Sequence, residues 1–158
     1  MAVEENKYLT FLSGKETYGM SILKVKSIIS MMPITPVPKM PDYFKGIINL
    51  RSKIVPIIDL KTKFGLGSSD YTASRTCIII VEIMIGGVLR TNGLVVDEVS
   101  EVLDITEGYI EPVPTYGEAS AEKEFISNIG KIKDKIIMLL DVERLFAVED
   151  AHPQGAEA

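Results

Sequence analysis

The chain has 158 residues, of which 46% are hydrophobic and 25% charged, and this balance is typical of one folded globular domain. Twenty-two acidic and seventeen basic residues give a net charge of −5, so the chain lacks the basic surplus that nucleic-acid binding requires. A single cysteine, Cys77, excludes an internal disulfide. With no signal-peptide pattern and no apolar run of ~18 residues, we expect a cytoplasmic protein without direct membrane insertion.

Short apolar runs rich in isoleucine and valine recur along the chain and are separated by turn residues. Runs of this length and composition predict many short β-strands that form a barrel or a sandwich. Helix is predicted only in short pieces, over residues 42–46, over 120–127 and from 141 onward. The predicted strand runs, in chain order, cover residues 8–12, 27–32, 47–50, 54–60, 77–85, 93–105 and 135–142.

Two sequence blocks of the first half recur in the second half. The offset between matching residues grows from 74 to 82, so the second copy contains additional residues, which we place in the loop-rich residues 107–124. The repeat predicts one domain, 7–148, with subdomain one at about 14–70, subdomain two at about 71–148 and a disordered tail at 149–158. The aligned blocks are residues 18–30 with 92–104 and residues 51–64 with 133–146.

The residue types that catalysis and metal binding need are scarce in this chain. Its one histidine, His152, lies in the tail, which argues against a Ser-His-Asp or Cys-His catalytic set, and the ligands of a zinc site are missing. Gly65 and Gly67 lack the third glycine of a nucleotide-binding fingerprint. We therefore expect a protein that is not an enzyme and that has no metal site and no cofactor.

Arg-Ser-Lys interrupts the most hydrophobic segment of the chain, residues 46–60. The repeat aligns Arg51 with Lys133, so a polar hairpin turn in both copies is one interpretation. The other is an interface anchor, because an arginine at a strand end beside a groove can make bidentate contacts. Asp59 and Asp141 follow strands at equivalent positions, which predicts that they cap turns or accept backbone hydrogen bonds.

The string GIINLRSKIVPIIDL, with YGMSILKVKSII before it and GLVVDEVSEVL after it, resembles the CheW family of bacterial chemotaxis coupling proteins. The match runs in order over about residues 7–146. It implies a mainly β fold of two intertwined SH3-like five-stranded β-barrel subdomains with a few short helices. It also implies a scaffold that couples methyl-accepting chemotaxis receptors to the histidine kinase CheA in arrays at the membrane. The residues of the structural motif are Gly46, Asn49, Leu50, Pro56 and Asp59.

The resemblance implies two binding surfaces. Receptor contact in the family centres on a groove between the subdomains, where the matching positions are Val25, Ser27 and Arg51. Kinase contact uses the outer ends of the subdomains, and in subdomain two the resemblance implies exposed residues on a loop that prolines stiffen. For the aromatic member of this set, packing against its own subdomain is an equal alternative. The implied kinase-binding residues are Ile110, Glu111, Val113 and Tyr116.

The chain departs from the family pattern in three places. Ser52 stands where glycine is usual, which is unfavourable if the position requires a positive φ. The hairpin over residues 84–93 is longer than usual, and Ser27 replaces a common acidic residue. Two alternatives remain: a CheW-like regulatory module of a larger kinase or adaptor, and a small-ligand-binding β-barrel. An aromatic content of 7% without tryptophan disfavours the second alternative.

Overall fold

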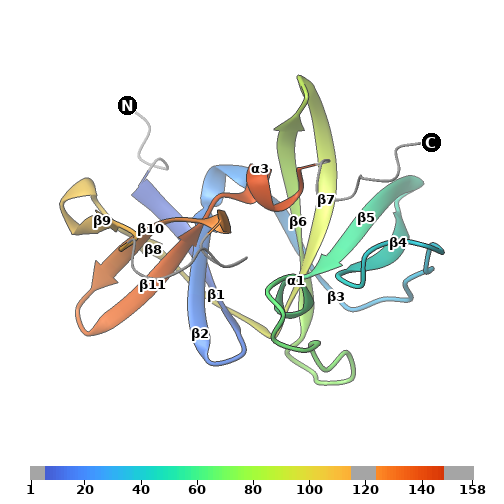
Figure 1. Ribbon diagram of the computed structural model, residues 1–158, viewed down its shortest axis with the longest axis horizontal. Coiled ribbons are helices and arrows are strands. Elements are labelled where there is room, and N and C mark those ends of the chain that lie inside the picture. The colour runs from blue at the N-terminus through green and yellow to red at the C-terminus, as the bar shows by residue number, and fades with distance from the viewer. Residues whose placement is uncertain (1–5, 115–123, 148–158) are drawn as a thin grey trace.

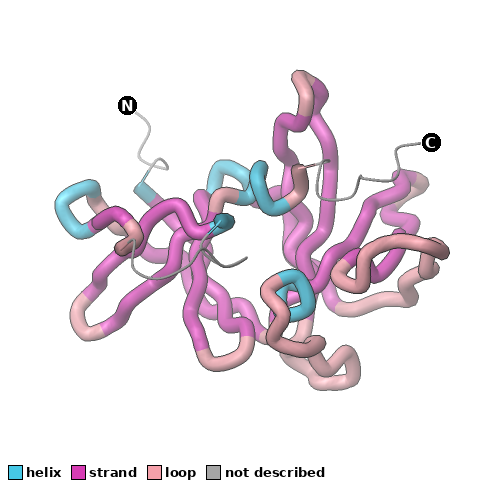
Figure 2. The backbone as a smooth tube through the Cα atoms, viewed as in Figure 1, coloured by secondary structure: helices cyan, strands magenta, loops and turns pink. Residues whose placement is uncertain are grey.

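The structure, a computed structural model, describes residues 6–114 and 124–147. These residues form two β-sheets joined by turns and a few short helices (Figures 1 and 2). The strands are β1 (Lys7–Ser13), β2 (Glu16–Ser21), β3 (Val25–Ser30), β4 (Phe44–Leu50), β5 (Lys53–Asp59), β6 (Cys77–Ile85), β7 (Val88–Val96), β8 (Glu98–Asp104), β9 (Ile110–Pro112), β10 (Ile126–Ile132) and β11 (Lys135–Leu140). The helices are η2 (Ile22–Lys24), α1 (Leu60–Lys63), η3 (Glu107–Tyr109) and α3 (Val142–Leu145).

The two sheets exchange strands along the chain. Sheet A has six strands in the order β8-β1-β2-β11-β10-β9, and sheet B has five in the order β3-β6-β7-β5-β4. The chain therefore crosses from sheet A to sheet B after β2 and returns after β7, so the two β subdomains are intertwined as expected. β6 and β7, which follow the expected boundary near residue 70, pair with β3 and β5, which precede it. Among the described residues, the edge strands of neither sheet pair with each other, so the expected barrels are open.

The internal repeat appears in the strand register of both sheets. In sheet A the parallel pair β2·β11 places Gly19 opposite Leu139, and in sheet B the parallel pair β7·β5 places Gly93 opposite Ile57. The sequence repeat equates these same residues, because 93 minus 19 is 74 and 139 minus 57 is 82. A Cβ atom on Gly93 would lie 2.5 Å from the Ile57 side chain, and one on Gly19 would lie 3.1 Å from the Leu139 side chain. Glycine thus permits the close parallel pairing in each copy.

Sheet B is buried on both faces at its centre, and its side chains alternate between two cores with the period of two that a strand imposes. Ile79 and Val81 of β6 pack into a core shared with β1 and β2 of sheet A. Ile78 and Ile80 point to the other face, where a second core lies against β4 and β5. We call this second face the outer face of sheet B, because no residue of sheet A belongs to its core.

Three expected helices have different outcomes. The C-terminal helix is confirmed as α3, a single turn. Residues 42–46 instead form a turn and the start of β4, so the helix expected there is wrong. Residues 120–123 of the helix expected over 120–127 lie outside the described residues, residues 124 and 125 are helical, and β10 already begins at Ile126. None of the helices in the described part of the chain is long and apolar enough to cross a membrane.

Candidate functional site

The hairpin between β4 and β5 carries Arg51 at its turn. Leu50 pairs with Lys53, so Arg51 and Ser52 are the two central residues, with φ angles of +53° and +68°. Positive φ at both central positions is the geometry of a type I′ turn. The equivalent residue of the second copy, Lys133, has a φ of +55°. The hairpin-turn interpretation is therefore confirmed, and Ser52 occupies a conformation that glycine adopts at lower cost.

A depression of about 280 Å³ lies next to this turn on the outer face of sheet B. Arg51 and Ser27 both line it, and Ile80, which is 1% exposed, contributes apolar surface. The Lys53 ammonium donates to the Thr91 hydroxyl at 3.5 Å across the depression. The depression thus lies within one sheet and not between the two. The residues that line it are Lys26, Ser27, Leu50, Arg51, Lys53, Ile80 and Thr91.

Val25 faces away from this depression. The register of β3 against β6 shifts between Val25 and Ser27, and such a bulge changes the face to which the following side chains point. Val25 packs half-buried against the core shared by the two sheets, whereas Ser27 lines the depression. Of the three predicted receptor-binding residues, the structure therefore brings together Ser27 and Arg51 and places Val25 on the opposite face of sheet B.

A smaller pocket of about 170 Å³ lies where β5 meets α3, the helix that follows sheet A. Pro56 and Ile58 line one side of it, and the ammonium of Lys63 lies 3.8 Å from the centroid of the Tyr43 ring. The same ammonium lies 4.9 Å from the ring of Phe125, the repeat equivalent of Tyr43. These cation–π contacts tie α1 to both copies of the repeat. This pocket lies between strands of sheet B and the helix that follows sheet A, and the predicted receptor-binding residues do not line it.

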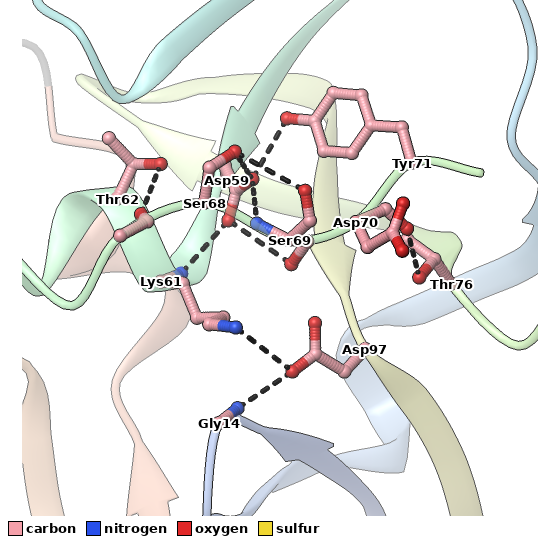
Figure 3. A network of polar contacts seen from close by, with 11 residues as sticks. Gly14, Asp59, Lys61, Thr62, Ser68, Ser69, Asp70, Tyr71, Thr76 and Asp97 are labelled. Carbon is pink, nitrogen blue, oxygen red and sulfur yellow. Dashed lines mark hydrogen bonds and ion pairs between the residues drawn. The ribbon is translucent and has the colours of Figure 1, made fainter. Parts of the chain in front are cut away.

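Asp59 is the centre of a buried polar network (Figure 3). Its side chain is 0% exposed and accepts hydrogen bonds from the Lys61 N–H at 3.0 Å, the Ser69 N–H at 3.1 Å and the Tyr71 hydroxyl at 2.8 Å. The hydroxyls of Ser68 and Ser69 lie 3.3 and 3.4 Å from the same carboxylate. Burial and, secondarily, this carboxylate raise the pKa of the Tyr71 hydroxyl, so the phenol remains a donor. The network anchors the connector after α1, which gives Asp59 a structural role.

The other motif residues divide between backbone geometry and surface. Gly46 has a φ of +138°, and a Cβ atom there would lie 2.1 Å from the carbonyl oxygen of Thr35, so only glycine fits. Asn49 is exposed on the edge strand β4, so its polar side chain needs no buried partner. Leu50 lines the depression beside Arg51. Among the described residues, no group of histidine, cysteine, aspartate and glutamate side chains could hold a metal ion.

Of the predicted kinase-binding residues, Ile110 and Glu111 lie on β9, an edge strand of sheet A, and Val113 follows this strand. Glu111 is exposed, and Val113 is half-buried. Ile110 was expected to be exposed, but it packs against the core around Ile105 because β9 pairs with β10. Tyr116 lies outside the described residues. Tyr109, which is 59% exposed directly before β9, is an aromatic side chain that the sequence analysis passed over.

The sequence analysis also missed exposed apolar residues at strand ends. Ile54 and Ile136 are 59% and 60% exposed, and the repeat aligns them with each other. Met84 and Leu89 of the β6–β7 hairpin are 53% and 58% exposed. Their position in the sequence could have indicated this exposure, because each of these residues lies within three residues of a hairpin turn, where a strand extends past the core.

Comparison with known proteins identifies clear relatives. A family model described as the CheW-like domain matches residues 7–150. Chemotaxis protein CheW of Klebsiella aerogenes is 36% identical over 91% of this chain and 83% of its own length, and the probable chemotaxis protein CheW of Rhizobium etli is 33% identical over 90% and 88%. The crystal structure of the scaffolding protein TtCheW from Thermoanaerobacter tengcongensis has a TM-score of 0.78 and 39% identity, over 91% of this chain and 89% of that chain.

Proposed function

The chain belongs to the CheW-like family and is a chemotaxis scaffold, and we propose that it joins methyl-accepting chemotaxis receptors to the histidine kinase CheA. In this proposal it acts by binding alone, without catalysis, at the cytoplasmic tips of receptors in membrane arrays. The relatives named as chemotaxis proteins and the structural match to a scaffolding protein support this function.

The observation that carries the receptor half of the proposal is the depression that brings Ser27 and Arg51 together. A receptor tip presents amphipathic helices, and a helix laid into an apolar groove is a common mode of peptide recognition. Arg51 stands on a tight turn and lines the depression, where its guanidinium can meet a carboxylate or a backbone carbonyl of a partner. Val25 then acts on this site through packing, because it fixes β3 against the shared core.

For the kinase half, we propose contact through the β9 edge of sheet A, with Ile110, Glu111 and Val113, together with Tyr116, which lies outside the described residues. An edge strand offers unpaired backbone groups to a partner strand. The exposed Glu111 and the half-buried Val113 are accessible to such a partner, whereas Ile110 contributes by holding β9 in place. The kinase and receptor surfaces then lie on different sheets, so one molecule can bind both partners at once.

Calorimetric titration of the full chain with an isolated receptor tip and with the regulatory domain of CheA tests the proposal. Arg51→Ala should weaken receptor binding at least ~10-fold, because hydrogen bonds to charged groups contribute about 1.5–3 kcal/mol. Lys133→Ala is the matched control, since this residue has the same φ on the equivalent turn of sheet A. We expect the control to bind both partners normally and both variants to melt like the wild type.

Two results would contradict the proposal at different levels. If the folded wild type binds neither partner, the coupling function is wrong. If the wild type binds the receptor tip and Arg51→Ala binds it equally well, the scaffold stands but the depression is not its receptor site.

A further inference from the structure

The β6–β7 hairpin extends beyond the rest of sheet B (Figure 1). β3 pairs with β6 only as far as Val81, and β5 pairs with β7 only from Gly93 onward. The segment between these two residues is therefore a two-stranded ribbon whose outer edges are unpaired. An unpaired ribbon that presents apolar side chains is a surface that a partner can cover.

The internal repeat shows how much of this ribbon is additional. The equivalent hairpin in sheet A is β1–β2, and both hairpins have two-residue turns. Gly19 lies three residues after Glu16, the first paired residue of β2, whereas Gly93 lies five residues after Val88, the first paired residue of β7. Between the glycine and the turn, each strand of the β6–β7 hairpin is thus two residues longer than its equivalent in the β1–β2 hairpin. The extra cross-strand pairs at the tip are Met84 with Leu89 and Ile85 with Val88.

Two exposed apolar residues of the tip, Met84 and Leu89, lie on the outer face of sheet B, as does the depression. β6 and β7 pair along their whole length without a register shift, so side chains alternate strictly between the two faces. Ile80 of the depression is followed on the same face by Glu82 and Met84, and Thr91 of the depression by Leu89. Met84 and Leu89 are direct cross-strand partners, so together they form one exposed apolar patch beside the depression.

Charges divide this face into two parts. Glu82 forms a salt bridge of 3.0 Å with Lys26, which neutralises the lysine at the rim of the depression. Neither Arg51 nor Lys53 forms a salt bridge with any residue that the structure describes. The face therefore presents two cations in the depression and, past the Lys26–Glu82 pair, the exposed Met84 and Leu89.

We propose that Met84 and Leu89 extend the receptor site, and that the occupant is an acidic amphipathic helix of the receptor tip. Its carboxylates meet Arg51 and Lys53, and its apolar side chains cover the Met84–Leu89 pair. The two strand residues from Thr91 to Leu89 span about 7 Å. At 1.5 Å per helical residue, the acidic and apolar residues of the partner lie about four positions apart on one helix face. This inference rests on the proposed receptor-binding function.

The test uses the full chain, a double variant and a matched control. The double variant Met84→Thr with Leu89→Thr removes the apolar patch, and threonine is favourable in β-strands, so the hairpin should still fold. Val88→Thr is the control, because Val88 is 51% exposed at the same tip but points to the opposite face. In calorimetric titration with the receptor tip, we expect the double variant to bind about 10-fold more weakly and the control to stay within about 2-fold. Binding of the CheA regulatory domain should be unchanged in both.

The outcomes separate this inference from the function on which it rests. If the wild type binds the receptor tip and the double variant binds it with equal affinity, the extension of the site is wrong while the receptor-binding function stands. If sedimentation shows a dimer of the wild type that the double variant abolishes, with receptor affinity unchanged, the occupant is a second copy and the proposal is also wrong. If the folded wild type does not bind the receptor tip, both proposals fail together.

Discussion

Asp59 and Asp141 offer a direct measurement of what a buried polar network contributes to stability. The two residues are equivalent in the internal repeat, and each begins a four-residue helix. Asp59 accepts from the Lys61 N–H at 3.0 Å, and Asp141 accepts from the Arg144 N–H at 3.2 Å. Their own N–H groups donate to the carbonyls of equivalent aromatic residues at 2.9 and 2.8 Å. Each aspartate therefore caps the helix that follows it, Asp59 through the second N–H of its helix and Asp141 through the third, and Asp59 also accepts from the buried network.

The expected difference follows from those further partners. Loss of a helix cap costs ~1 kcal/mol, so Asp141→Ala should lower the free energy of unfolding by about that amount. Asp59→Ala loses the same cap and also leaves the Ser69 N–H and the Tyr71 hydroxyl without their acceptor. Each buried donor left unsatisfied costs about 1–3 kcal/mol, so the lost cap and the two donors together give an expected total of about 3–7 kcal/mol for Asp59→Ala.

Urea unfolding followed by far-ultraviolet circular dichroism compares the two variants under identical conditions. If Asp59→Ala does not fold, Asp59→Asn serves instead. It keeps one acceptor oxygen, and its loss of stability should lie between the losses of the two alanine variants. The reasoning fails if the alanine variants of Asp59 and Asp141 lose equal stability to within about 0.5 kcal/mol, because the network would then contribute nothing beyond the shared cap.

Three further predictions concern single positions. Gly46→Ala should destabilise by about 3 kcal/mol or more, because its Cβ atom would lie 2.1 Å from the Thr35 carbonyl oxygen. Gly14→Ala, with a φ of +66° and open space around it, should cost only ~1 kcal/mol in thermal or urea unfolding, and equal losses at both positions would contradict the steric argument. Ser52→Gly should raise the free energy of unfolding by about 0.5–1 kcal/mol and so raise the urea midpoint, since a φ of +68° suits glycine. A lower midpoint would show that Ser52 is not strained. The wild type should be more stable than Tyr71→Phe, and the difference in free energy of unfolding should be constant below about pH 9 and become smaller above about pH 10. The reason is that the phenol has a pKa near 10.0 in the unfolded chain and a raised pKa in the folded chain. Urea unfolding of both proteins at several pH values tests this, and a difference that grows above pH 10 would show that the folded pKa is lowered.

The sequence repeat predicted equivalent residues correctly but not how the strands pair. Its offsets identified the two glycines of the parallel pairs and the two capping aspartates, because these positions are constrained by local backbone geometry. The repeat block at 18–30, however, contains β2 in one sheet and β3 in the other. The same sequence similarity arises whether each copy folds on itself or exchanges strands with its partner. The boundary near residue 70 was therefore placed from the repeat alone, whereas β6 and β7, which follow it, pair with β3 and β5, which precede it.

Side-chain direction at the candidate site depended on a single bulge. Strict alternation places Val25 and Ser27 on one face of a strand, and both were predicted to contact the receptor directly. The register shift between them turns Val25 into the shared core and leaves Ser27 beside Arg51. A bulge inserts one residue without a strong sequence signal, so the pattern of apolar residues could not reveal it. The positive φ at Ser52, in contrast, was a conditional expectation that the turn geometry confirms.

The two copies of the internal repeat have similar backbones but present different side chains on their surfaces. The two copies share their parallel pairs, their turns with positive φ and their capping aspartates, so the frame of each sheet is held by the same physical constraints. They differ at positions that these constraints do not determine. Arg51 at one turn corresponds to Lys133 at the other, and the tip of the β6–β7 hairpin is longer than that of the β1–β2 hairpin. Side chains at exposed turns and tips support little of the core, so they can change with little loss of stability. If the chain binds a receptor and a kinase as we propose, its specificity for each is therefore expected at these tips, where the two copies diverge.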